Sequence, residues 1–121
     1  MTVQQMFNSL PILQRMMELK LPISKAYAIY ILAKQINDER EFFINREKQL
    51  ISQYDANVLE NGNIQFKTSE DQMKFSQEHA EMMQCELENL KPVHLNIEDL
   101  GESKFTPMEL ISLEGAIIWN E

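Results

Sequence analysis

Residues 23–54 contain neither glycine nor proline, and this uninterrupted stretch constrains the fold more than any other feature. The whole chain of 121 residues holds only three glycines and four prolines. All-β sandwiches and barrels need turn residues roughly every 8–12 positions, so this composition argues against them. We therefore expect one helix over residues 23–54, about 48 Å long at 1.5 Å per residue.

The two halves of this long segment differ in character. Residues 26–33 are apolar on all sides, which is typical of a helix buried on several sides. The second half is charged and keeps only a thin apolar stripe. The stripe recurs every seven residues, at Ile29, Ile36, Phe43 and Leu50. Such a repeat predicts left-handed, coiled-coil-like pairing with another helix.

A second helix is expected after a β-turn. Residues 56–68 contain Asn61-Gly62 flanked by apolar residues, the strongest short-range signal for a β-hairpin. Thr68 then provides a hydroxyl N-cap, and two acidic residues follow it in the first turn, where they suit the helix dipole. We predict a helix over residues 69–91 that runs antiparallel to the charged half of the first.

Shorter elements are expected at both ends of the chain. Thr2 and Gln5 form a capping box, and the residue before Pro11 is disfavoured in a helix, so residues 1–22 predict two short helices with a break there. Residues 93–97 alternate apolar and polar side chains, which indicates a half-buried strand. Thr106 and Glu109 form a second capping box, with Pro107 at the first position of a final helix over about residues 107–114. The apolar tail at residues 116–119 should pack against the core.

Together these elements predict a single, mainly α domain over residues 1–121. Its centre is a long antiparallel helical hairpin, coiled-coil-like, with a small β-hairpin or turn at its tip, packed on short N- and C-terminal helices. The predicted parts are N-terminal helices at 1–22, the long helix at 23–55, the tip at 56–68, the second hairpin helix at 69–91, and a strand-like segment with the C-terminal helix at 92–121.

The net charge of −8 is distributed unevenly. Residues 1–59 carry six acids and seven bases, a net +1, whereas residues 60–121 carry thirteen acids and four bases, a net −9. Nucleic-acid binding rests on clustered cations that neutralise phosphates, so this distribution predicts no direct nucleic-acid binding. An acidic half attracts basic protein surfaces, and it also favours solubility.

Motifs for catalysis and cofactor binding are absent from the sequence. Cys85 is the only cysteine, which excludes an intrachain disulfide, and the neighbouring Glu86 opposes thiolate formation. Neither His79 nor His94 has further ligands at metal-binding spacing. No Walker A loop, dinucleotide fingerprint or nucleophile elbow occurs. The sequence therefore predicts a protein that is not an enzyme, with no cofactor and no metal.

No targeting or membrane-spanning segment is expected. The first ten residues contain no Lys or Arg and no long apolar core, unlike a signal peptide. The longest nearly apolar run, residues 26–33, is far shorter than the roughly 20 residues of a membrane span. We expect no membrane association.

The serial order of several segments resembles a family of short proteins, with no established activity, encoded by bacteriophages and prophages of Gram-positive bacteria. The segments are Leu19-Lys20-Leu21-Pro22, Lys25-Ala26-Tyr27, Leu50-Ile51-Ser52-Gln53-Tyr54, Glu60-Asn61-Gly62-Asn63-Ile64, Ile97-Glu98-Asp99-Leu100 and Pro107-Met108-Glu109-Leu110-Ile111-Ser112-Leu113. The resemblance implies a phage origin and a location in the bacterial host cytoplasm or on the virion. It brings no catalytic residues.

Three functional hypotheses follow. The first is a protein-interaction module that binds a phage or host protein and acts as a phage assembly factor or a host-protein binder. The second is an acidic counter-defence inhibitor that mimics nucleic acid, and the third is a homo-oligomeric structural component of the virion, paired through the apolar stripe. The candidate partner-binding residues are Ile36, Phe43, Leu50, Glu78, Glu81 and Glu88.

Overall fold

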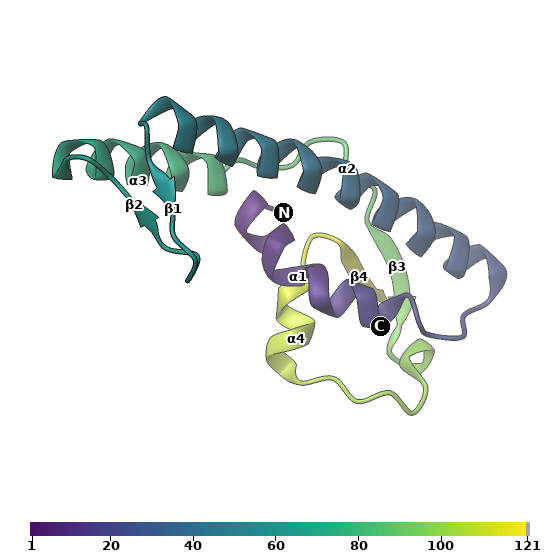
Figure 1. Ribbon diagram of the computed structural model, residues 1–121. Helices are drawn as coiled ribbons and strands as arrows, with labels where there is room; N and C mark the ends of the chain where they lie inside the picture. The colour runs from purple at the N-terminus through teal and green to yellow at the C-terminus, as the bar shows by residue number, and fades with distance from the viewer. Residues whose placement is uncertain (121) are drawn as a thin grey trace.

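The computed structural model describes residues 1–120 and shows a mixed α/β fold with four α-helices and two sheets of two strands each (Figure 1). The elements in chain order are α1 (Val3–Met16), α2 (Ile23–Gln53), β1 (Asn57–Val58), β2 (Ile64–Gln65), α3 (Ser69–Met83), β3 (Val93–Asn96), the 3-10 helix η1 (Ile97–Leu100), α4 (Pro107–Ser112) and β4 (Ile117–Asn120). Helix α2 runs along the whole molecule. The β1–β2 hairpin and α3 lie at its C-terminal end, and the other elements gather beneath its N-terminal half.

The predicted long antiparallel helical hairpin is wrong. Helix α2 was correctly expected, but α3 has 15 residues and ends at Met83 rather than at residue 91. The chain after α3 instead pairs with the N-terminus, where the Val3 N–H donates to the Cys85 carbonyl and the Leu87 N–H donates to the Met1 carbonyl, both at 2.9 Å. These backbone bonds replace helical ones, so a tertiary contact overrides the local helical preference. Helix α3 therefore packs against only the C-terminal part of α2.

The apolar stripe of α2 does not pair with a single helix, so the coiled-coil-like interpretation is also wrong. Ile29 and Ile36 belong to the main core under the N-terminal half of α2. Leu50 belongs to a second, smaller cluster with Phe75 of α3. The half-buried Phe43 packs against both clusters. The seven-residue repeat thus reflects one face of a long helix that meets two different neighbours.

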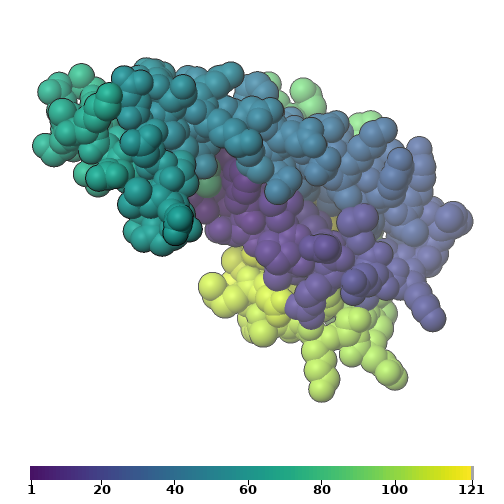
Figure 2. All heavy atoms as spheres, viewed as in Figure 1, coloured from purple at the N-terminus to yellow at the C-terminus, as the bar shows by residue number. Residues whose placement is uncertain are grey.

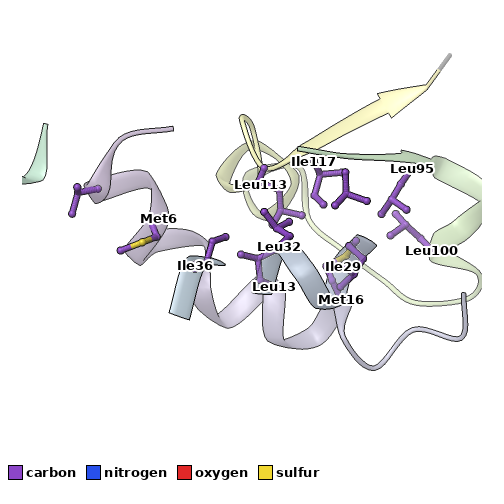
Figure 3. Packing of buried hydrophobic residues seen from close by; sticks show 13 residues of the cluster. Met6, Leu13, Met16, Ile29, Leu32, Ile36, Leu95, Leu100, Leu113 and Ile117 are labelled. Carbon is purple, nitrogen blue, oxygen red and sulfur yellow. The ribbon is translucent and has the colours of Figure 1, made fainter. Parts of the chain in front are cut away.

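The main core lies where α1, α2, α4 and the β3–β4 sheet converge (Figure 3). Ten of its buried apolar side chains are labelled in Figure 3: Met6, Leu13, Met16, Ile29, Leu32, Ile36, Leu95, Leu100, Leu113 and Ile117. The buried polar residue Ser9 donates its hydroxyl to the Met6 carbonyl at 2.7 Å, so its burial leaves no donor unpaired.

Helix α1 is continuous through Pro11, so the predicted break at this residue is wrong. Proline lacks the N–H that would donate to the Phe7 carbonyl, a loss of roughly 3 kcal/mol in a helix interior. Residues on both sides of Pro11 are fully buried, Met6 before it and Met16 after it, while Pro11 itself lies at the surface. Packing of both halves against the core outweighs the local penalty. The capping box of Thr2 and Gln5 is confirmed.

The β-hairpin is confirmed at the predicted place. Strands β1 and β2 are antiparallel, with Val58 opposite Ile64, and Gly62 adopts a φ of +87° in the connecting turn. Phe66, just after β2, lies 5.1 Å from Phe75 of α3 between ring centroids. The hairpin is therefore anchored on α3, which compensates for the marginal stability of two short strands.

The C-terminal segment forms a parallel sheet that was not expected from the sequence pattern. The strand expected at residues 93–97 is confirmed as β3, and the apolar tail forms β4 beside it, with Val93 opposite Ile117. A crossover through η1 and α4 connects the two strands, as a parallel pair requires. Helix α4 begins at Pro107 with the expected capping box of Thr106 and Glu109. Lys25, near the N-terminus of α2, connects this helix to η1, since its Nζ lies 2.6 Å from Asp99 Oδ2.

Candidate protein-interaction groove

An open groove of about 630 Å³ runs along the line where α1 packs against the middle of α2, and we call it the α1–α2 groove. It is lined by Leu10, Pro11, Leu13, Gln14 and Met17 on the α1 side and by Tyr30, Ala33, Lys34, Ile36, Asn37 and Arg40 of α2. Figure 2 shows the surface of α1 emerging along the lower edge of α2. The volume falls within the range of about 300–1,000 Å³ that is typical of ligand sites.

Helical periodicity explains why these residues share one groove. Leu10, Leu13 and Met17 are three or four positions apart and so lie on one side of α1. Tyr30, Ala33 and Asn37 repeat this spacing on α2. The two helices meet through their buried inner faces and leave these flanking residues on the two sides of the opening.

The floor of the groove is apolar and its walls expose large apolar side chains. Leu13 and Ile36 are buried at 5% and 1% exposure, and they close the bottom. Met17 and Tyr30 remain 55% and 52% exposed. Large apolar side chains that rim a concavity, rather than standing singly on a convex surface, are typical of protein-binding sites.

The charged residues of the groove are both cations. Lys34 and Arg40 stand on the α2 side, whereas the polar residues Gln14 and Asn37 are uncharged. Within residues 1–120, neither Lys34 nor Arg40 forms an ion pair. The α1–α2 groove therefore combines an apolar floor with one positive edge in a protein of net charge −8.

A second groove, the α2–α3 groove of about 470 Å³, brings four of the six sequence-predicted residues together. They are Phe43, Leu50, Glu78 and Glu81. Leu50 is buried, Phe43 is half-buried, and Glu81 is exposed. Glu78 accepts a hydrogen bond from the Tyr54 hydroxyl at 2.9 Å. Burial is the main cause that raises the pKa of the Tyr54 hydroxyl, and the hydrogen bond to the Glu78 carboxylate raises it further.

The other two predicted residues lie elsewhere. Ile36 is buried in the floor of the α1–α2 groove, and Glu88 is exposed in the segment that follows α3. The six residues thus do not form one surface. Met17, Tyr30, Lys34 and Arg40 were not among the residues predicted for the site. A signal for Tyr30 was present, because residues 26–33 are apolar on all sides and the neighbours of α2 cover only some of them.

Several carboxylates of the acidic half have partners within the chain. Asp99 pairs with Lys25, Glu109 pairs with Arg15, and Glu86 lies 3.2 Å from the amino group of Met1. The pKa of Asp99 is lowered by the hydrogen bond from Lys25 and then by the Asn96 N–H. The pKa of Glu109 is lowered mainly by the Thr106 N–H. These carboxylates stabilise the packing of η1, α4 and the N-terminus, and they belong to different elements.

The described residues show no arrangement for metal chemistry or membrane crossing. In residues 1–120, no three His, Cys, Asp or Glu side chains are grouped so as to hold a metal ion. None of the helices in this part of the chain is long and apolar enough to cross a membrane.

His79 Nε2 lies 2.9 Å from Glu47 Oε2, and the imidazole stacks on Phe75, so this histidine connects α3 to α2.

Comparison with protein-family models, curated protein sequences and solved structures found no match to this chain.

Proposed function

We propose that this chain is a non-enzymatic protein-interaction module whose α1–α2 groove receives a helix of a protein partner. The observation that carries the proposal is the groove itself, with its apolar floor and the half-exposed Met17 and Tyr30 on its walls. Burying such side chains against a partner stabilises a complex by roughly 25 cal/mol for each Å² of apolar surface removed from water.

The shape of the groove favours a helical occupant. Its walls are two helices, and the side-chain ridges of a third helix pack into the grooves of the others. Tyr30 and Arg40 are ten residues apart on α2, or about 15 Å. This length accommodates nearly three turns of a helix that presents apolar residues at positions i, i+3 or i+4, and i+7.

The resemblance to phage and prophage proteins supports a role for this binding in an infected or lysogenic bacterium. On this proposal, the chain acts as a phage assembly factor or a host-protein binder, and its partner is a phage or host protein met in the host cytoplasm or on the virion. The acidic mimic of nucleic acid is the less favoured alternative, because the carboxylates of residues 60–120 are distributed over several elements and some are paired internally. The homo-oligomeric virion component is the other alternative. Pairing through Ile36 and Leu50 would require both buried side chains to become exposed.

Site-specific photo-crosslinking in cells tests the proposal. A benzophenone amino acid replaces Tyr30 or Met17 in the groove, and matched control proteins carry it at Met73 of α3 or Met108 of α4, both 73% exposed. We expect a crosslinked adduct with another protein at the two groove positions and no adduct at the controls. Equal crosslinking at all four positions, or none in the groove, contradicts the proposal. An adduct between two copies supports the homo-oligomer.

A further inference from the structure

The α1–α2 groove has a charge asymmetry that specifies its occupant more narrowly. Its two charged residues, Lys34 and Arg40, stand on the same side, six positions apart on α2, or about 9 Å along the helix. Both are exposed, and both lack an ion-pair partner within residues 1–120. The opposite side offers the amide of Gln14 and the ring of Pro11, neither of which is charged.

Some other cations of the chain have carboxylate partners, whereas Lys48 and Lys91, like Lys34 and Arg40, have none within residues 1–120. Lys25 pairs with Asp99, Arg15 pairs with Glu109, and Lys74 pairs with Glu70. The α2–α3 groove is also different, since it contains Arg46 together with Glu78 and Glu81, so its charges are mixed. The α1–α2 groove combines an apolar floor with charges of one sign, and complementarity then favours a partner of the opposite sign.

We propose that the α1–α2 groove selects an acidic amphipathic helix, whose apolar side covers Leu13, Met17 and Tyr30 and whose carboxylates face Lys34 and Arg40. This inference rests on the proposed function and specifies its partner. Lys34 and Arg40 are about 9 Å apart along the axis of α2, a rise that corresponds to carboxylates six or seven residues apart on the bound helix. Asp or Glu at those positions pairs with both cations at once, whereas Lys or Arg there is repelled.

Two fluorescein-labelled synthetic peptides of 15 residues test this selectivity by fluorescence anisotropy with the full chain. Both carry Leu at positions 1, 4, 8 and 11 of an Ala-rich helix. One has Glu at the flanking positions and the other has Lys. Two exposed ion pairs contribute modestly, so we expect the Glu peptide to bind about tenfold more tightly at low salt. The preference should shrink as added salt screens the charges.

Matched variants show whether Lys34 and Arg40 cause the preference. The double substitution Lys34→Glu/Arg40→Glu should reverse it in favour of the Lys peptide. Lys48→Glu/Lys91→Glu changes the net charge equally at two exposed lysines outside the groove and should leave the preference intact. Ala33→Trp fills the groove and should abolish binding of both peptides. Circular dichroism confirms that each variant remains folded.

The outcomes separate this inference from the proposed function. Equal binding of both peptides, blocked by Ala33→Trp, leaves a helix-binding groove but overturns the selectivity for acidic helices. A preference that the Lys48→Glu/Lys91→Glu control removes equally overturns the assignment to Lys34 and Arg40. Binding that persists in Ala33→Trp places the peptide outside the groove and overturns both. Sedimentation of the free protein as a dimer that Ala33→Trp dissociates assigns the groove to a second copy, which overturns this inference.

Discussion

Replacing Gly115 with alanine tests the contact that holds the N-terminus against the turn between α4 and β4. Gly115 has a φ of +91°, and a Cβ added there would lie 3.1 Å from Met1 Cβ and 3.2 Å from Met1 N. Carbon atoms pack best at about 3.5–4.0 Å, so Met1 or the turn must move. Gly62 provides a matched control, because its φ is +87° but a Cβ there would meet nothing within 4 Å.

The two substitutions differ by the steric contact alone. A left-handed backbone costs an L-residue about 1–2 kcal/mol, offset by about 0.4–1 kcal/mol from the lower entropy of the unfolded chain. Gly62→Ala should therefore lower the free energy of unfolding by about 1 kcal/mol. Overpacking adds about 1–3 kcal/mol, so Gly115→Ala should cost about 2–4 kcal/mol in total.

Thermal unfolding followed by circular dichroism measures both effects. With an unfolding entropy of about 2.1 cal/mol/K per residue, 1 kcal/mol lowers the Tm of a chain of this size by about 4 °C. We expect a loss of about 4 °C for Gly62→Ala and about 8–16 °C for Gly115→Ala. Equal losses in the two variants would refute the reasoning, because they would show that Met1 does not pack against Gly115 in solution.

Three further predictions concern the core, α1 and the Lys25–Asp99 pair. Leu32→Ala should lower the free energy of unfolding by about 2–5 kcal/mol, since Leu32 is 1% exposed, whereas Ile97→Ala, at 53% exposure, should cost far less. Urea titration compares the two variants, and equal losses of stability contradict the core assignment. Pro11→Ala should raise the urea midpoint, since it restores a backbone donor to the Phe7 carbonyl, and a lowered midpoint would show that the proline is needed for packing. The Asp99 pKa lies below its ordinary 3.8, so its stabilisation is present above that value and is lost as the pH falls through the lower, folded-state pKa. Urea midpoints from pH 6 to pH 2 should therefore converge for wild type and Asp99→Asn, and a gap that stays constant contradicts this assignment.

The fold was predictable where the signal is local. Helix α2, the Asn61-Gly62 hairpin and the capping boxes of Thr2 and Thr106 arise from contacts within a few residues, and the structure confirms each of them. The start of α3 belongs to the same class, because the Thr68 hydroxyl accepts from the Asp71 N–H as a short-range cap. Such features depend on backbone sterics and capping, which the neighbouring residues specify.

The candidate groove was not predictable to the same extent. Its residues come from α1 and α2, and nothing in the local pattern says which face of α2 meets α1. Ile36 was identified from the seven-residue repeat, but it lies in the floor of the groove, while the exposed Met17 and Tyr30 form its walls. Lys34 and Arg40 share the edge of the groove only because α1 covers the neighbouring face of the helix.

The sequence by itself determined the long helix, the hairpin at its end, the N-caps, and the charge difference between the two halves. Only the tertiary structure decided where α3 ends, that α1 continues through Pro11, and that the apolar tail becomes a strand beside β3. The physical reason is that each of these depends on partners distant in sequence. The N-terminal residues take the hydrogen bonds of residues 85–87, core packing outweighs the local cost of Pro11, and Val93 finds its strand partner in Ile117.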